Sequence, residues 1–189
     1  MGPMGVSAPD RISLDDFILE MMRIPAAELT VGRLDGLFRR LELSEELLRA
    51  NVHFAKDAYA RNLICRTPRF DMLLLCWRPG HVTTIHDHAG SINVTQVFRG
   101  TLTARTFEVT ERPAPDRRVL RPAGEEQLGP GRNSLVDAVG IHQLANASAE
   151  DLVTLHVYAP PLREITVYYP ATGRYERVAL RYTLEDEFA

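Results

Sequence analysis

Several features are scarce in this chain of 189 residues. It has only two cysteines, too few for an extracellular disulfide scaffold, which favours a reducing cytoplasm. It has one lysine, and a net charge of −3 gives no electrostatic reason to expect nucleic acid as a partner. It has no apolar run of about 18 residues and no basic start followed by an apolar segment. We therefore expect a soluble, cytoplasmic protein that does not bind a membrane.

The remaining composition is that of an ordinary globular protein, with 45% hydrophobic and 25% charged residues, and the length fits one domain over 1–189. We expect 1–10, rich in small residues, to be disordered. Residues from about 12 to 55 show helical spacing of apolar side chains. Ser13 is a candidate cap for the first helix, Pro25 ends it, and Ser44 is a candidate cap for a third.

From about 58 to 189 the chain becomes rich in short β-type runs separated by Gly, Pro and polar turns. Examples are "FDMLLLCW", "INVTQVF", "DLVTLHVYA" and "ITVYY". Many short strands without an intervening helical period predict a mainly β fold, as a sandwich, jelly roll or closed barrel. The sequence also predicts that 111–118 is an exposed loop and that Cys65 and Cys76 are buried in neighbouring strands.

The stretch "IHDHAGS" places two histidines two positions apart. Side chains at this spacing on a strand share one face, so His86 and His88 should point together and Asp87 away from them. A chain of this composition contains such a pair by chance roughly 0.2 times, so the pair alone is weak. It could be a metal-binding pair or two partly exposed histidines at a strand end.

The surrounding residues make the pattern more specific. The stretch resembles the first cupin motif, G-x5-H-x-H-x3,4-E-x6-G, with matches at Gly80, His86, His88 and Gly100. Further on, "GIHQLAN" resembles the second cupin motif, with His142 as a third ligand and Asn146 four residues later, although the usual preceding proline and glycine spacing is not kept. Together, the two half-motifs in this order predict a metal site in a cupin fold.

The first motif lacks its carboxylate, because Asn93 stands at the glutamate position. Three neutral imidazoles would leave a divalent metal its full charge, which favours an anionic ligand such as a soft thiolate. Residue chemistry alone leaves iron, zinc, nickel and copper open.

At this point the sequence resembles the cysteine dioxygenase family of thiol dioxygenases, from about Ala58 to Arg177. The resemblance rests on "YARNLI", "LLLCWRPGHVTTIHDHAGS", "GIHQLANAS" and "LVTLHVYAPP". It implies a cupin fold (a double-stranded β-helix, or jelly-roll barrel) after a short N-terminal helical segment. It also implies one non-haem Fe(II) held by His86, His88 and His142, and oxidation of a thiol with O2 to a sulfinic acid.

The strand "LVTLHVYAPP" carries three polar side chains on one face. Thr154, His156 and Tyr158 alternate, so a hydroxyl, an imidazole and a phenol could form a hydrogen-bonded line. They could also be satisfied polar groups of an ordinary core strand. The resemblance implies a catalytic Ser-His-Tyr line here, with Thr154 keeping the hydroxyl.

Arg61, with Tyr59 on the same face, is the candidate substrate-binding residue. Arginine can hold a carboxylate through two parallel hydrogen bonds, although one arginine among many is more often a surface residue. The resemblance maps Arg61 onto the arginine that binds the carboxylate of cysteine. Relatives that act on 3-mercaptopropionate typically carry glutamine there.

Animal members of the family have a cysteine at the position of Asn93, cross-linked to the active-site tyrosine. The resemblance therefore implies a bacterial type in which Tyr158 is unmodified and no protein-derived Cys-Tyr cofactor forms. We expect a monomer that converts L-cysteine and O2 to cysteine sulfinic acid. The alternatives are a 3-mercaptopropionate dioxygenase, a non-catalytic metal-binding cupin, and a zinc or nickel cupin isomerase.

Overall fold

The computed structural model describes residues 10–182. The chain begins with α1 (Leu14–Arg23), a short 3-10 turn η1 (Ala26–Glu28), α2 (Val31–Phe38) and α3 (Glu45–Asn51). The hydroxyls of Ser13 and Ser44 accept backbone hydrogen bonds at the starts of α1 and α3, and Pro25 follows the end of α1, as predicted. The expected disorder of 1–10 concerns residues that, apart from Asp10, lie outside the described range.

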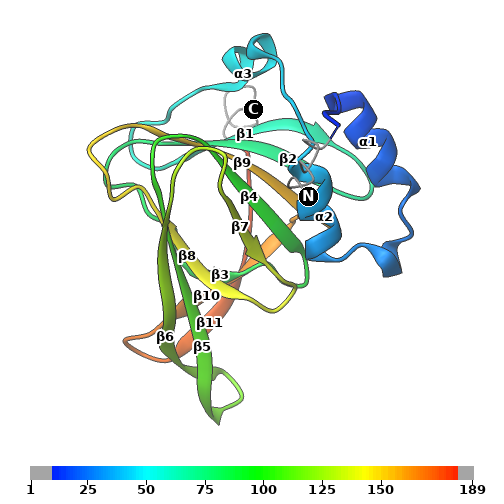
Figure 1. Cartoon of the computed structure of the whole chain (residues 1–189). Coiled ribbons are helices and arrows are strands. Elements are labelled where there is room, and N and C mark those ends of the chain that lie inside the picture. Colours follow the sequence, from blue (N-terminus) through cyan, green and yellow to red (C-terminus); the bar gives the residue numbers. More distant parts are fainter. Residues whose placement is uncertain (1–9, 183–189) are drawn as a thin grey trace, which may run out of the picture.

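Strands account for most of the rest, and the mainly β fold with an N-terminal helical segment is confirmed (Figure 1). The strands are β1 (Ala60–Arg66), β2 (Asp71–Trp77), β3 (Ile85–Asp87), β4 (Ile92–Arg99), β5 (Leu102–Ala114), β6 (Arg117–Leu128), β7 (Asn133–Val136), β8 (Ile141–Ala145), β9 (Leu152–Ala159), β10 (Glu164–Tyr169) and β11 (Arg174–Ala179). One sheet has the order β1-β2-β9-β4-β7. The other runs β10-β11-β6-β5-β8-β3 and closes through the pairing of β3 with β10.

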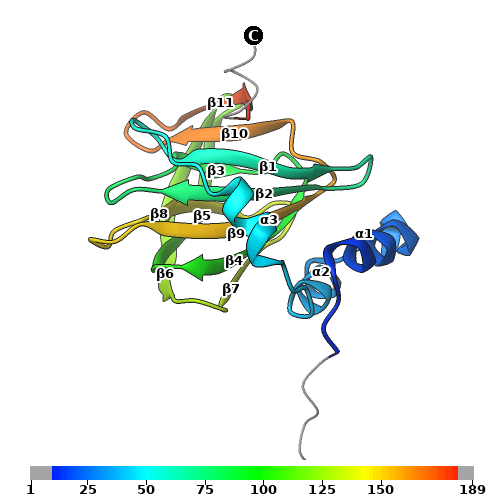
Figure 2. The same ribbon diagram turned by 90° about the horizontal axis from the view of Figure 1, so that it is seen from above.

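The five-stranded sheet is covered on both faces, so its central strands β2 and β9 are buried along their whole length. Alternate residues of β9, including Val153, Leu155 and Val157, pack with the apolar faces of the helices, which lie outside this sheet (Figure 2). The intervening residues of β9, Thr154 and His156 among them, point to the barrel interior. Within residues 10–182, no helix has the length and apolar character needed to cross a membrane.

Two sequence predictions are wrong in detail. Residues 111–118 are not a loop, because they form the end of β5, a tight turn and the start of β6 in a long hairpin that projects from the molecule (Figure 1). Cys65 and Cys76 do lie in the neighbouring strands β1 and β2, but only Cys76 is buried, while Cys65 is half-buried. Cys65 lies toward the end of β1, where it packs at the margin of the apolar core that the helices share with the sheet.

Candidate metal centre

Three histidines from two adjacent strands meet inside the barrel. His86 of β3 lies directly opposite His142 of β8, and His88 follows two residues after His86 on the same side. The possible ligand atoms of the three side chains all lie within 4.8 Å of one another, and all three residues are buried. The two half-motifs of the sequence are therefore brought to one point.

A tight turn directly after β3 sets the direction of His88. The backbone of Gly90 has a φ of 101°, which favours glycine, and the N–H of Ser91 donates to the His88 carbonyl at 3.1 Å. Asp87 points away from the metal site, as the alternation predicts. Its carboxylate accepts hydrogen bonds from the backbone of Ala89 at 2.8 Å and from the Tyr168 hydroxyl at 2.7 Å.

The electrostatics of the group suit a metal. Burial lowers the pKa of His86, and it lowers the pKa of His88 and His142 well below the usual histidine value. All three imidazoles are therefore neutral at pH 7 and can offer a lone pair, which metal binding requires. His86 donates from Nδ1 to the Thr84 carbonyl at 2.9 Å, so its Nε2 keeps the free lone pair.

The spacing of one pair of nitrogens also fits a metal. Nε2 of His142 lies 3.1 Å from Nε2 of His88. Two histidine nitrogens bound at neighbouring positions of a metal at about 2.1 Å are themselves about 3 Å apart. The Nδ1 atoms of these two rings are buried and have no hydrogen-bond partner among the described residues, so of the three histidines in this group only His86 has a tautomer fixed by a hydrogen bond to the chain. The donor set therefore fits a divalent metal held by three neutral nitrogens.

The polar line on β9 forms as a buried hydrogen-bond chain. Thr154 Oγ1 lies 2.8 Å from His156 Nε2, and the Tyr158 hydroxyl lies 3.1 Å from His156 Nδ1. The indole N–H of Trp77 donates to Thr154 at 2.9 Å. Burial lowers the pKa of His156 to about 3 and raises the pKa of Tyr158 to about 12, so both side chains are neutral at pH 7. The ring of Tyr158 contacts that of His88, with centroids 5.1 Å apart.

Arg61 lies beside this group and is buried, with 9% of its surface exposed. Its positive charge contributes to the low pKa of His86, His88 and His156, and a hydrogen bond from Arg61 acts to lower the pKa of Tyr158 against the larger effect of burial. A guanidinium in this position favours an anionic ligand. Tyr59, the second predicted substrate residue, stacks on Trp77, with ring centroids 4.3 Å apart.

Asn93 is fully buried in β4, directly opposite Tyr158 of β9. Its amide contacts the hydroxyl of Thr95 and the backbone carbonyl of Val157. Sequence reasoning did not name Thr95, Trp77 or Tyr182, whose ring lies over Arg61 at 5.8 Å. Thr95 could have been found from its alternation with Asn93, whereas nothing in the local sequence indicates the other two.

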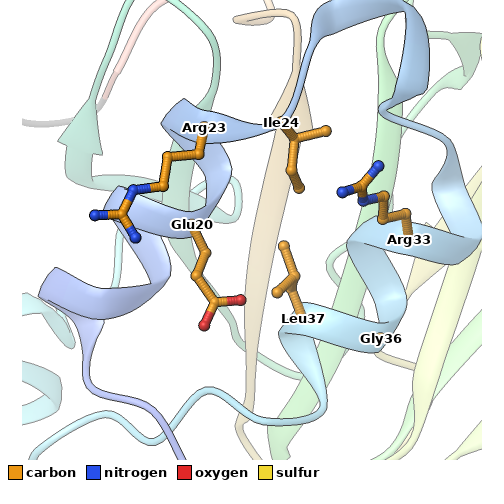
Figure 3. A pocket seen from close by; sticks show the side chains of 6 residues that line it. All are labelled: Glu20, Arg23, Ile24, Arg33, Gly36 and Leu37. Carbon is orange, nitrogen blue, oxygen red and sulfur yellow. The ribbon is translucent and has the colours of Figure 1, made fainter.

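A hollow lies between the N-terminal helices, away from the strands that carry the histidines. Figure 3 shows its lining, in which Ile24 and Leu37 face each other and the charged groups of Glu20 and Arg23 lie to one side. Glu20 is already paired with Arg40 at 2.9 Å. This hollow therefore brings together no set of ligand side chains comparable to the three histidines.

Comparison with known proteins identifies the family of this chain. The sequence profile of the family described as "Cysteine dioxygenase type I" matches residues 11–170. The cysteine dioxygenase type 1 of Danio rerio is 26% identical over 177 residues, which are 90% of this chain and 86% of the relative. The human protein of the same name is 29% identical over 162 residues, which are 82% of this chain and 78% of the relative.

Solved structures support the fold. The protein TT1209 from Thermus thermophilus aligns with a TM-score of 0.50 and 24% identity, over 60% of this chain and 94% of that one. A Klebsiella pneumoniae protein with a double-stranded β-helix domain aligns with a TM-score of 0.50 and 14% identity, over 70% of this chain and 87% of that one. The fold is thus a cupin, as predicted, and with a profile match over most of its length this chain belongs to the cysteine dioxygenase type I family.

Proposed function

We propose that the protein is a non-haem iron dioxygenase that oxidises L-cysteine with O2 to cysteine sulfinic acid. The observation that carries the proposal is the buried group of three neutral histidines without a carboxylate, beside a buried arginine and tyrosine. Family membership supports a thiol as the substrate class. The atoms and electrons of this reaction balance, because both atoms of O2 end on sulfur and no external reductant is needed.

His86, His88 and His142 would hold the Fe(II). Fe(II), when bound, supplies the redox chemistry through which a thiolate and O2 combine. The three histidines add no negative charge, so the site keeps a strong preference for an anionic sulfur ligand. Because burial lowers their pKa values, the three imidazoles are neutral at pH 7, so protons do not compete with the metal for their nitrogen lone pairs.

Arg61 would bind the carboxylate of cysteine through its planar guanidinium. Tyr158 would donate a hydrogen bond near the reacting sulfur, since its raised pKa keeps its proton in place at pH 7. His156 and Thr154 are buried and hydrogen-bonded in line, Thr154 to His156 and His156 to Tyr158, so their role would be to orient the Tyr158 hydroxyl. Holding the substrate in one orientation beside the metal supplies much of the rate gain in such reactions.

Several further expectations belong to this proposal. Asn93 has no sulfur with which to form a thioether, which supports an unmodified Tyr158. The free thiols of Cys65 and Cys76 support a reducing cytoplasm. We also predict that the protein is a monomer, that it acts on L-cysteine and O2, and that it is of the bacterial type.

Oxygen uptake with L-cysteine tests the activity. Protein loaded anaerobically with Fe(II) should consume one O2 per cysteine and yield cysteine sulfinic acid, identified by mass spectrometry. His142→Ala, which removes one ligand, is the matched control and should be inactive. No uptake, or cystine as the only product, would contradict the proposal.

Metal analysis tests the cofactor. Protein purified without added metal should contain iron in proportion to its activity, up to one per chain. Zinc or nickel at one per chain, with no activity that depends on iron, would favour a cupin isomerase or a non-catalytic metal-binding cupin instead.

A further inference from the structure

Two residues of β4 lie opposite the polar line of β9. In the antiparallel register, Asn93 faces Tyr158 and Thr95 faces His156. All four side chains lie on the interior side of the sheet and are buried. Thr95 Oγ1 lies 2.9 Å from His156 Nδ1 and 2.9 Å from Asn93 Oδ1, so one hydroxyl joins the amide to the imidazole.

The orientation of the Asn93 amide is fixed by its neighbours. Its nitrogen lies 3.0 Å from the carbonyl oxygen of Val157 and 3.3 Å from that of Val94. Carbonyl oxygens only accept hydrogen bonds, so the NH2 group must point to them, and the amide oxygen must point to Thr95. The hydroxyl of Thr95 therefore donates to Asn93.

This assignment determines the proton on His156. Thr95 has a single hydroxyl proton, which is used by Asn93, so toward His156 it can only accept. Nδ1 of His156 must therefore carry a hydrogen. The imidazole is neutral, so its Nε2 has the lone pair and accepts from Thr154 at 2.8 Å. Thr154 in turn accepts from the indole of Trp77, which can only donate.

The same assignment leaves the Tyr158 proton uncommitted. The Tyr158 oxygen lies 3.1 Å from Nδ1 of His156, which already carries a hydrogen, so the oxygen can accept from His156 but not donate to it. Arg61 also has only donors, so the tyrosine cannot donate to it either. In the opposite tautomer of His156, Nδ1 would be a lone pair, and the Tyr158 proton would turn to it.

We propose that Asn93 and Thr95 are positioning residues that hold His156 in the Nδ1–H tautomer and thereby keep the Tyr158 proton directed to the three-histidine site. In this chain, Asn93 stands at the position of the first cupin motif's glutamate. From there, hydrogen bonds across the sheet through Thr95 and His156 orient the hydroxyl of Tyr158. The catalytic consequence rests on the proposed thiol dioxygenase function, while the tautomer does not.

The tautomer can be measured directly. Protein labelled with 15N at histidine and loaded with Zn2+, a diamagnetic ion, is examined by long-range 1H–15N correlation, with His156 assigned from the spectrum of His156→Gln. We expect a protonated Nδ1 and an unprotonated Nε2. A protonated Nε2 in the unaltered protein would overturn the proposal, and this result does not depend on whether the protein oxidises cysteine.

Two variants of Thr95 link the tautomer to catalysis. Thr95→Val removes the hydroxyl at nearly constant volume, and Thr95→Ser keeps it as the matched control. We expect Thr95→Val to populate the Nε2–H tautomer and to lower kcat for cysteine oxidation roughly tenfold with KM within about twofold, because substrate contacts are unchanged. Thr95→Ser should keep both the tautomer and kcat. Equal losses in both variants, or an unchanged tautomer in Thr95→Val, would contradict the proposed role.

Discussion

In the proposed function, the choice of thiol depends on Arg61. A guanidinium–carboxylate pair contributes about 1.5–3 kcal/mol, so Arg61→Gln should lower kcat/KM for L-cysteine roughly 10- to 100-fold. We expect a smaller loss for 3-mercaptopropionate, because the resemblance places glutamine here in relatives that use that thiol. Steady-state oxygen uptake with both thiols measures the two ratios.

Arg61→Lys serves as the control, since lysine keeps the charge but not the planar pair of donors. It should fall between the unaltered protein and Arg61→Gln for cysteine. Equal losses for both thiols in Arg61→Gln would contradict a carboxylate-binding role that is specific to cysteine.

In the proposed metal site, His142 is the ligand from the second half-motif, and its removal should abolish tight metal binding. His142→Ala leaves two imidazoles, and we expect a loss of affinity greater than the roughly 10- to 100-fold that follows when only a supporting partner of a ligand is removed. Calorimetric titration with Fe(II) or Zn2+ measures it. His81→Ala is the matched control, because His81 lies in a turn, where its Nδ1 accepts from the backbone of Arg78. Similar affinities in both variants would place the metal elsewhere.

At the scale of single residues, the sequence was most informative where partners lie close along the chain. His86 and His88 could be paired because alternation on a strand is a local property. Thr95 could not be joined to His156, because that contact depends on the register between β4 and β9, which no local pattern specifies. The same holds for Trp77, whose indole reaches Thr154 from the neighbouring strand.

Helix α1 shows how the N-terminal segment supports the sheet that carries the polar line. Phe17 is fully buried and contacts Phe38 of α2 and Phe70 beside β2, with ring centroids 6.2 and 5.9 Å away. Phe17→Ala should lower the free energy of unfolding by about 3–5 kcal/mol, because it leaves a cavity in this core. Leu19→Ala on the same helix should change it by less than about 0.5 kcal/mol, since Leu19 is 52% exposed.

Urea denaturation followed by circular dichroism measures both variants. A loss in Phe17→Ala no larger than that in Leu19→Ala would show that the helices contribute little to the stability of the sheet.

Elements with clear end signals were predicted well, and those without were not. Ser13 and Ser44 mark helix starts through side-chain caps, which depend on residues only three positions away. The stretch 111–118 contains two prolines and several charges, so it lacks the alternation of a half-buried strand. It forms a hairpin because β5 and β6 pair along their full length, although most of its side chains are exposed.

For the whole molecule, the class of fold followed from many short strands and two spaced half-motifs, but the order β1-β2-β9-β4-β7 did not. β9 lies between β2 and β4 although it is far from both in sequence. Such non-local pairing depends on the simultaneous burial of both faces of the sheet. Apolar runs in the sequence indicate this burial, but they do not show which strands pair. The position of Tyr158 opposite Asn93 is a consequence of that order.

The buried histidines make the stability of the whole molecule sensitive to acid. The pKa of His156 is about 3 in the folded protein and about 6.5 in an unfolded chain, so the unfolded state binds more protons as pH falls below 6.5. Stability is therefore complete above about pH 6.5 and decreases toward pH 3, with a loss from this residue of about 3 kcal/mol at pH 4.5. His88 and His142, whose pKa values are also lowered, act in the same direction.

Urea denaturation of chelator-treated protein at pH 7.5 and 4.5 should show a smaller pH dependence of the free energy of unfolding in His156→Gln than in the unaltered protein. If the two pH dependences were equal, the His156 imidazole would have to be protonated in the folded protein at pH 4.5, against the hydrogen-bond chain in which its Nε2 accepts from Thr154.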